Sequence, residues 1–279
     1  AFRAQITDNQ VVDALGSFST SLHQWSTNAG LIDASRFWPT LIATAAEIES
    51  NYDLVETTLR KCGRTADSTT ITSLAGRVTD IEAAYKQLFP KLDEQIGFRM
   101  RPLQDQWLGY GSGIMAHVGR LTEKRLLVDE ARVVAVQPVM GGYGYAHLQT
   151  NMARIEAVLT NPMGELPEVV RLAWLVSQLN LEIPVFSETL GSQALHRLAP
   201  LAMLPPILAA AQVVDLSKCT SEVAALAIEH WHIPLPPEAN IQDHVAPTLM
   251  DWWETYLQTR PDWHIAMQAL GKMLLSRNP

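Results

Sequence analysis

A glycine-rich stretch carries the residues of this chain whose types and spacing are best suited to chemistry. Residues 141–147 read Gly-Gly-Tyr-Gly-Tyr-Ala-His, which places two phenolic hydroxyls and one imidazole among three glycines. Glycine allows backbone conformations that other residues resist, and histidine is the most frequent general acid or base. Two interpretations are open. The stretch is either one wall of a pocket, or a long connection between strands whose aromatic side chains pack on a sheet edge.

Charged residues after this stretch extend the candidate site. Arg154 and Glu156 share one face of a predicted strand, and Glu168 and Arg171 lie on the next predicted helix. A buried charge without a partner is costly, so these groups favour a structural ion pair. The alternative is an arginine that holds a carboxylate or phosphate beside the glycines. The candidate pocket residues are Tyr143, His147, Asn151, Arg154, Glu156 and Arg171.

Other motifs give less specific signals. His230 and His232 alternate around a tryptophan and are the weak candidates for a metal site, but zinc needs three or four ligands in fixed geometry. The alternative is that they face the negative end of a helix dipole. The glycines at 109–113 lack the preceding strand of a dinucleotide site and the lysine of a phosphate loop. No GxSxG nucleophile motif occurs. We therefore predict no cofactor and no metal.

The first hundred residues predict the helices that come before the site. Three apolar stripes recur with steps of three and four residues: Val11 to Trp25, Leu41 to Leu59, and Ile71 to Leu92. Each stripe marks one face of a helix. Turns at 28–30 and 62–63 and a break at Pro90 separate them, and Asp67 or Ser68 is suited to cap the third. We predict an antiparallel helical bundle over 1–100, with a coiled coil between chains as the alternative.

Residues 101–279 predict an α+β part. A fourth helical segment over 101–121 is expected to be interrupted near 109–113, where three glycines each cost about 1 kcal/mol in a helix, with Ser112 capping a new short helix. The runs 132–139 and 154–159 predict two strands that pair antiparallel through the glycine stretch, with 126–128 as a possible third. The small sheet near 125–160 must then be covered by helices. The fold class is α+β, mainly α, and the two parts are possibly one continuous domain.

The later helices are predicted from similar signals. A turn at 161–164 precedes a helix over 167–180 that is apolar almost all round, which indicates burial on most sides. Helices then begin at Ser192 and Ser221, the first breaking at Pro205-Pro206. The proline-rich stretch 233–242 is predicted to be an extended linker, and helices over 248–259 and 263–275 end the chain. Core packing is predicted for the C-terminal aromatic residues, with an exposed partner-binding patch as the alternative: Trp252, Trp253, Tyr256 and Trp263.

The strand, turn and helix over 154–180 resemble the core of zincin metallopeptidases. The residues concerned are RIEAVLTNP and LPEVVRLAWLVSQLN. In that family the helix carries HExxH, whose histidines bind zinc while the glutamate activates water. Here the corresponding positions hold Arg171-Leu172-Ala173-Trp174-Leu175, so none of the family's functional residues is present. The resemblance implies a zinc-free relative that kept the scaffold. The same two segments also resemble an uncharacterised bacterial protein family, which implies no function.

Composition narrows the classes of function. The 279 residues are 47% hydrophobic and 18% charged, with a formal net charge of −8. An acidic chain disfavours nucleic acid or an anionic membrane as the main partner. The longest apolar stretch, 198–214, is broken by prolines and does not predict a membrane span. Two lone cysteines, Cys62 and Cys219, favour reduced thiols in the cytoplasm. The chain starts at Ala1 without methionine, and whether a leader was removed stays open.

The sequence contains no complete catalytic set, although it predicts much helical surface. We therefore expect a non-catalytic soluble binding or scaffold protein that acts through helical surfaces. A protein partner or self-association, such as a homodimer through a heptad face or the C-terminal aromatics, is expected. The alternative is a hydrolase-like enzyme, possibly a degenerate metallopeptidase-like scaffold, with a pocket between the glycine stretch 141–147 and the helix 167–180.

Overall fold

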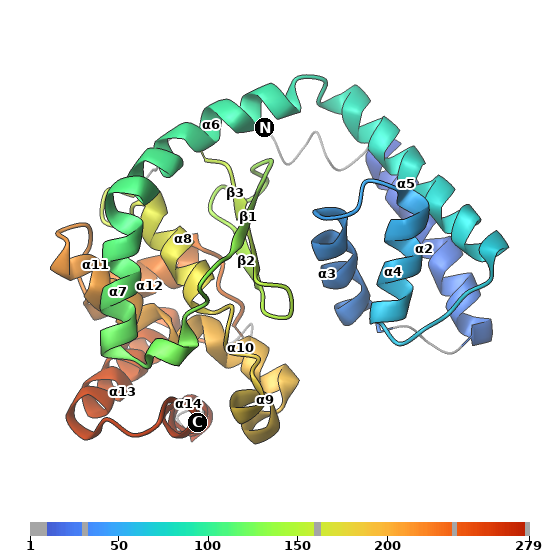
Figure 1. The fold of residues 1–279 in the computed structure, drawn as a ribbon. Helices are drawn as coiled ribbons and strands as arrows, with labels where there is room; N and C mark the ends of the chain where they lie inside the picture. The colour runs from blue at the N-terminus through green and yellow to red at the C-terminus, as the bar shows by residue number, and fades with distance from the viewer. Residues whose placement is uncertain (1–9, 30–32, 159–162, 236–238, 277–279) are drawn as a thin grey trace. The chain divides into compact units, whose positions relative to one another are not determined.

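A computed structural model gives the fold of the chain (Figure 1). It describes all residues except 1–9, 30–32, 159–162, 236–238 and 277–279. The fold is mainly helical with one small sheet, which confirms the predicted α+β class. The chain divides into two compact units, Ala1–Gln95 and Ile96–Pro279, and each is treated by itself.

In the described residues of the first unit, four helices precede the helix that crosses its boundary. They are α2 (Gln10–Ala29), α3 (Ala34–Ala45), α4 (Asn51–Lys61) and α5 (Ser68–Leu88). The predicted stripe from Leu41 to Leu59 is therefore two helices and not one. The side-chain hydroxyl of Ser50 accepts a hydrogen bond from the amide of Asp53 and so caps the start of α4. Asp67 caps α5 in the same way, as the sequence predicted.

The apolar stripes of these helices meet inside the unit. Phe18 and Phe37 are fully buried and their rings lie 6.1 Å apart between centroids. The other fully or nearly buried members of this cluster come from α2, α3, α4 and α5: Leu22, Leu41, Leu54, Val55, Leu59, Ile71, Leu74, Ala75 and Val78. Much of each heptad-like stripe is therefore packed within the unit, although the stripe members Leu15 and Tyr52 are 38% and 37% exposed. The coiled coil with another chain stays a prediction.

The boundary between the units falls in α6 (Leu92–Gln106), and the helix continues beyond it. A π-helical segment, η1 (Trp107–Gly111), joins α6 to α7 (Ser112–Leu121) without a break. The α-helix is thus interrupted close to the predicted place, but by a π-helical turn, and the capping role of Ser112 is wrong, since Ser112 has helical backbone angles. The reason lies in packing. A Cβ at Gly111 would stand 2.6 Å from the ring of Trp107, so this glycine makes room for an indole inside a helix.

This geometry predicts opposite effects for two neighbouring glycines. Gly111→Ala is expected to lower the free energy of unfolding by about 1–3 kcal/mol, because the new methyl group displaces the indole. Gly109→Ala meets nothing within 4 Å and is expected to raise it by roughly 0.5–1 kcal/mol through helix propensity. Urea unfolding followed by circular dichroism measures both. Equal effects of the two changes would contradict the packing explanation.

The sheet lies in the second unit and has the strand order β1-β3-β2. Its strands are β1 (Arg132–Val136), β2 (Gly144–His147) and β3 (Met152–Glu156). β2 pairs antiparallel with β3, whereas β1 pairs parallel with β3. The predicted antiparallel pairing of the first and third runs is therefore wrong. The glycine stretch contains a strand of its own, which forms a hairpin with β3 and leaves β1 the other edge. The possible third strand at 126–128 is not formed, since Leu126 ends a 3-10 turn, η2 (Lys124–Leu126), and the next two residues are irregular.

Helix α8 (Glu168–Ser177) packs on β2 and β3 (Figure 1). Every residue from Val169 to Ser177 is buried, which confirms the prediction from its apolar pattern, although the helix ends before Asn180. The later elements are α9 (Pro184–Leu190), α10 (Ser192–Ala202), α11 (Leu204–Val213), α12 (Ser221–His230), η3 (Ile241–Val245), α13 (Ala246–Thr259) and α14 (Trp263–Ser276). Gly30, residues 159–162 and residues 236–238, on which some predicted turns, strand ends and linker positions fall, lie outside the described residues.

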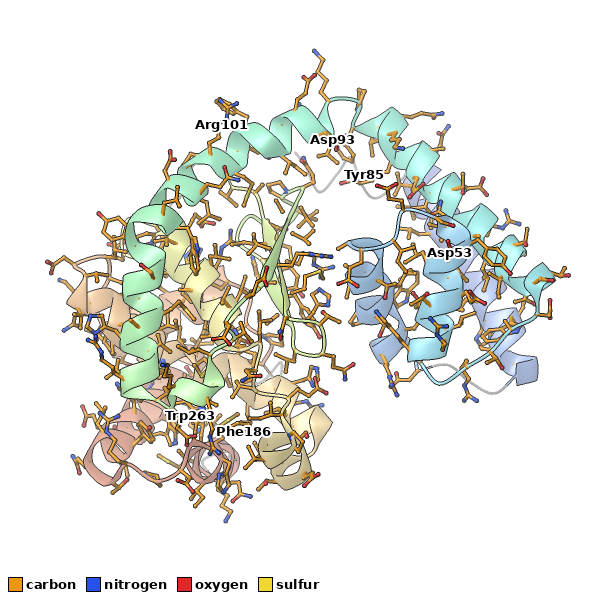
Figure 2. All side chains as sticks on the ribbon, viewed as in Figure 1. Asp53, Tyr85, Asp93, Arg101, Phe186 and Trp263 are labelled. Atoms are coloured by element: carbon orange, nitrogen blue, oxygen red, sulfur yellow. The ribbon has the colours of Figure 1, made fainter. Side chains whose placement is uncertain are left out.

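The C-terminal aromatic residues belong to the core. Trp252, Trp253, Tyr256 and Trp263 are at most 4% exposed, and Figure 2 shows Trp263 among the side chains of the C-terminal helices. The indole N–H of Trp252 donates to the carbonyl of Ala266 at 2.7 Å. The core-packing interpretation is confirmed, and these rings form no exposed patch.

One helical stretch, Ala194–Val213, is long and apolar enough by composition to cross a membrane, but 67% of its most apolar window is buried inside the protein. Such burial is also typical of a core helix. The stretch comprises α10 and α11, which separate at Met203, two residues before the predicted break at Pro205-Pro206.

Candidate functional site

A single carboxylate organises the glycine stretch. Glu156, at the end of β3, is 3% exposed. Its Oε1 accepts hydrogen bonds from the amides of Val139 and Met140 at 2.8 and 2.9 Å. Its Oε2 accepts from the amides of Gly141, Gly142 and Tyr143 at 2.7, 2.9 and 3.1 Å. Five successive backbone N–H groups thus surround one side chain. Such a nest is a binding site for an anion, and here the chain supplies the anion itself.

The nest keeps Glu156 ionised. Burial by itself raises the pKa of this carboxyl, but the hydrogen bonds from Met140, Val139, Tyr143 and Gly142 lower it, and the net pKa lies below its ordinary value. A carboxylate held by several amides gains charge-assisted hydrogen bonds that its protonated form loses. Glu156 is therefore not poised to donate or accept a proton near neutral pH.

Arg171 ties the same loop to helix α8. Its side chain is fully buried. Nη1 donates to the carbonyl of Tyr143 and Nη2 to the carbonyl of Glu156, each at 2.9 Å. Nη2 also forms an ion pair with Glu168 one turn earlier on the helix. Burial raises the pKa of Glu168, and the charge and hydrogen bond of Arg171 oppose that rise. The structural ion pair expected from the sequence is thus present between Glu168 and Arg171.

Arg154 contacts aromatic rings, whereas its position beside Glu156 suggested an ion pair. Its guanidinium lies 5.8 Å from the ring centroids of both Tyr143 and Tyr145, a distance typical of cation–π contact. The Tyr145 ring also meets the ring of His147 edge-on at 4.8 Å. Burial raises the pKa of Tyr145, so its hydroxyl stays protonated. Arg154 and the rings of Tyr143, Tyr145 and His147 thus form one contiguous group on the β2–β3 hairpin, in which the His147 ring is buried.

The remaining predicted residues are not gathered into one cavity. His147 is 5% exposed. Asn151 is exposed and adopts a left-handed conformation with φ of 46° in the turn before β3. Its carbonyl accepts the amide of Arg132 at 2.9 Å, which starts the pairing of β1. Asn151 is therefore suited to a structural role in the sheet.

A small pocket lies between the glycine stretch and helix α8, with a volume of about 50 Å³. Of the six residues proposed from sequence, only Tyr143 lines it. The lining comes from β2, α8, α10 and the segment after α12: Tyr143, Gly144, Tyr145, Ala146, Leu148, Trp174, Leu175, Gln178, His196, Ala199, Pro200, Trp231, His232 and Pro234. Most of these are apolar or aromatic, and the rim reaches the surface at Pro234, which is exposed.

Hydrogen bonds fix the walls of this pocket. The indole N–H of Trp174 donates to the carbonyl of Pro200 at 2.8 Å, which joins α8 to α10. Gln178 donates to the carbonyl of Trp174 at 2.9 Å, and the rings of Trp174 and Trp231 lie 5.1 Å apart. Two glycines allow the close approach of the loop. A Cβ at Gly144 would stand 2.5 Å from Leu175, and one at Gly142 would stand 2.3 Å from the carbonyl oxygen of His230.

His232 joins the pocket for a reason that the sequence pattern does not show. It has a φ of 52°, a left-handed conformation that costs energy for a non-glycine residue. His230, in contrast, is the last residue of α12, where a histidine faces the negative end of the helix dipole. Among the described residues, no group of three or more histidine, cysteine, aspartate or glutamate side chains is placed to hold a metal ion. Among the described residues, His230 and His232 therefore have no further side chains with which to form a metal site.

The two cysteines are free thiols. Burial raises the pKa of the Cys219 thiol to about 11, so this side chain is almost entirely protonated near neutral pH and is a poor nucleophile. Burial also raises the pKa of Cys62. Neither thiol lines the pocket.

Comparisons with protein-family models, with curated proteins and with solved structures found no match to this chain. The resemblance of residues 154–180 to the zincin core therefore stays a prediction.

Proposed function

We propose that this protein is a non-catalytic binding protein, and that the pocket between β2, α8 and α10 takes one short aliphatic side chain of a protein partner. The observation that supports the proposal is the contrast between two neighbouring regions. Glu156 and Arg171, the charged groups that contact the glycine stretch, form their hydrogen bonds within the chain. The adjoining pocket, in contrast, is lined by tyrosine, tryptophan, leucine and proline side chains.

The size of the pocket selects the kind of ligand. An engineered apolar cavity of roughly 150 Å³ in another protein takes up benzene, and this pocket has about a third of that volume. A cofactor or a drug-sized ligand needs roughly 300–1,000 Å³. A single valine-sized side chain suits the space, because it fills an apolar depression without requiring polar partners. Such pockets hold the anchor residue of a protein interface.

The hydrolase-like alternative finds less support in the same geometry. It requires His147, Glu156 and Arg171 to face a common cavity. None of the three lines the pocket. Glu156 accepts five amides, and Arg171 is surrounded by two carbonyls and a carboxylate. A catalytic carboxylate near neutral pH is usually tuned toward a raised pKa, and that of Glu156 is lowered.

The proposed binding surface lies beside the sheet, whereas the sequence predicted binding through helical surfaces. Most residues of the N-terminal stripes and the C-terminal aromatics, which were the expected dimer surfaces, are packed inside their own units, although Leu15 and Tyr52 are exposed. The free thiols suit a reducing compartment such as the cytoplasm, and we include that location in the proposal. A protein partner remains the proposed ligand class.

A series of short peptides tests the proposal. The probes are acetylated and amidated pentapeptides Gly-Ser-X-Ser-Gly with X as glycine, alanine, valine or tryptophan. Binding is followed by nuclear magnetic resonance of the indole N–H groups of Trp174 and Trp231. We expect valine to bind about tenfold or more tightly than glycine, because burying an aliphatic side chain contributes roughly 1.5–3 kcal/mol. Tryptophan is expected to bind no better than glycine. An affinity independent of X, or highest for tryptophan, would contradict the proposal.

A variant whose pocket is filled by a larger side chain, compared with a matched variant elsewhere, serves as the control. Ala199 lines the pocket and is 1% exposed, so Ala199→Val is expected to occupy the space and to abolish the preference for valine. Ala209→Val makes the same change on α11, at a position that does not line the pocket. It should leave the preference intact. If both variants behave alike, the indole resonances report binding elsewhere.

A further inference from the structure

The outer edge of β1 is open among the described residues. In the parallel pair, the backbone groups of Arg132 and Val136 bond to β3, as shown by Arg132 donating to Asn151 and Ala157 donating to Val136, each at 2.9 Å. Strand geometry alternates, so the N–H and C=O groups of Val133 and Ala135 point away from β3. No described strand pairs with that side, because the sheet ends at β1.

The opposite edge of the sheet, formed by β2, has another segment of the chain beside it. The chain around His230 to Pro234 lies against the glycine stretch beside β2, as the approach of the His230 carbonyl to Gly142 shows. Proteins commonly cover or charge an edge strand to prevent unwanted pairing. No described strand covers the outer side of β1, and its outward positions Val133 and Ala135 are uncharged, although Arg132 at the start of the strand is exposed. Instead, Val133 is 38% exposed, and the loop after the strand exposes Val139 and Met140 by 46% and 44%.

Backbone hydrogen bonds hold the exposed loop at 139–140 in place. The amides of Val139 and Met140 donate to Glu156, so the backbone is fixed while the two side chains stay in solvent. An ordered apolar loop beside an open strand loses little conformational entropy when a ligand binds.

We propose that the outer edge of β1 binds an extended peptide segment of a partner protein, which adds a fourth strand to the sheet. The β1 edge surface comprises Val133, Ala135, Val139 and Met140. Main-chain hydrogen bonds to Val133 and Ala135 supply the pairing, and the apolar side chains of the peptide contact the loop. This surface is separate from the pocket, whose lining includes no residue of β1.

The extent of the surface argues for a peptide and against a second copy of the chain. The stretch from Val133 to Met140 spans eight residues, and five strand residues extend about 17 Å. A stable dimer usually buries around 1,600 Å² in total, with roughly 20–30 residues on each side. A single extended segment fits the shorter length.

Charge near the strand favours a basic segment. Asp129 and Glu130 precede β1, with Glu130 exposed, and the whole chain carries a net charge of −8. Arg132, exposed at the start of the strand, is the opposing cation. A peptide with alternating β-branched residues contacts the apolar loop, and its terminal lysine pairs with Glu130 before the strand.

The test uses two peptides of the sequence Lys-Thr-Val-Thr-Val-Thr-Val-Lys. The probe carries N-methyl groups on alternate central residues, which leaves one edge able to pair and prevents its aggregation. The control is N-methylated at every central residue, which blocks both edges. Hydrogen exchange of the full chain is measured with each peptide. We expect the probe to slow exchange of the Val133 and Ala135 amides at least tenfold, and the control to leave them unchanged.

A variant of the protein separates pairing from other contacts. Ala135→Pro removes one outward N–H while leaving the bonds of β1 to β3, and it is expected to weaken probe binding at least tenfold. Met140→Ser is the second variant, which reduces the apolar contact without altering the strand. Equal binding of probe and control peptide by the unmodified chain, or protection away from β1, would overturn the proposal. Protection of Val133 that rises with protein concentration and needs no peptide would overturn it in favour of self-association.

Discussion

Glu156→Ala is expected to lower the free energy of unfolding by about 3–5 kcal/mol, because it leaves five backbone amides without their common acceptor. The native carboxylate accepts the amides of residues 139–143 at 2.7–3.1 Å. Urea unfolding followed by tryptophan fluorescence measures the loss. A surface substitution usually changes stability by no more than about 0.5 kcal/mol, so Glu130→Ala at an exposed position serves as the control.

Acetate should restore part of that stability. The alanine variant keeps the nest of N–H groups but leaves space where the carboxylate was, so a free carboxylate can occupy it. We expect acetate to raise the midpoint of unfolding in Glu156→Ala more than chloride at equal ionic strength, and to have no such effect on Glu156→Gln, whose side chain still fills the site. Identical effects of acetate on the two variants would contradict an open anion nest.

The pH dependence has a definite sign. The hydrogen bonds to Glu156 place its folded-state pKa below its ordinary value of 4.5. A carboxyl with a lowered pKa contributes stability that is fully present above the unfolded value and is lost as the pH falls through the folded value. The stability difference between the native protein and Glu156→Ala should therefore be constant above about pH 5 and shrink below it.

Arg171→Ala is expected to be at least as damaging, with a loss of about 3–5 kcal/mol. Removing this fully buried guanidinium takes one of two donors from the carbonyls of Tyr143 and Glu156, which keep the amides of Glu156 and Val158, and leaves the largely buried Glu168 without its cation. Arg171→Lys should recover little, because one ammonium group cannot reproduce the fork that reaches three acceptors. Chemical unfolding monitored by circular dichroism measures each variant.

Two further variants separate the charge from the hydrogen bonds to the backbone. Glu168→Gln leaves the arginine and both carbonyl contacts, so it should cost less than Arg171→Ala. The double variant Arg171→Met, Glu168→Met removes the charged pair together, and replacing a buried pair by apolar residues is often tolerated. We expect only partial recovery here, because the carbonyls of Tyr143 and Glu156 still lose the arginine donor that ties the loop to α8. Full recovery would show that the ion pair, and not the attachment of the loop, is what Arg171 supplies.

Much of the fold could be predicted from periodicity and breaks. The apolar stripes located α2 and α5, the continuous apolar run located α8, and the prolines and small polar residues located the starts of α12, α13 and α14. These signals are local, which is why they succeed. The antiparallel pairing of β1 with β3 failed for the opposite reason. Strand partners depend on where the intervening residues go, and the short strand Gly144–His147 was concealed among glycines.

The helical passage through residues 107–111 shows a second limit of sequence reasoning. Three glycines in five residues indicate a break if only backbone propensity is counted. The structure uses Gly111 to admit the ring of Trp107. Tertiary packing therefore overrides propensity at this point, and a single sequence contains no sign of it.

The residues of the candidate site were harder to predict than the fold. A pocket does lie between the glycine stretch and α8, with Tyr143 on one side and Trp174 on the other, but the other five proposed residues do not line it, and its role stays a proposal. His196, Trp231 and His232 were missed because they come from elements far along the chain. Arg154 and Glu156 lie two residues apart on the same face of β3. Glu156 nevertheless contacts five amides, while Arg154 contacts two tyrosine rings. Side chains on one strand face can have unrelated partners, which spacing alone does not reveal.

The internal carboxylate of Glu156 is proposed to shape a surface whose function is binding, and this is the central claim. The most direct measurement is the affinity of the valine pentapeptide for the native protein and for Glu156→Ala, followed by the indole resonance of Trp174 under conditions in which both remain folded. We predict that Glu156→Ala binds the peptide at least tenfold more weakly and that acetate restores part of the affinity. Equal affinity of the two proteins, or a loss that acetate leaves unchanged while it restores stability, would contradict the claim.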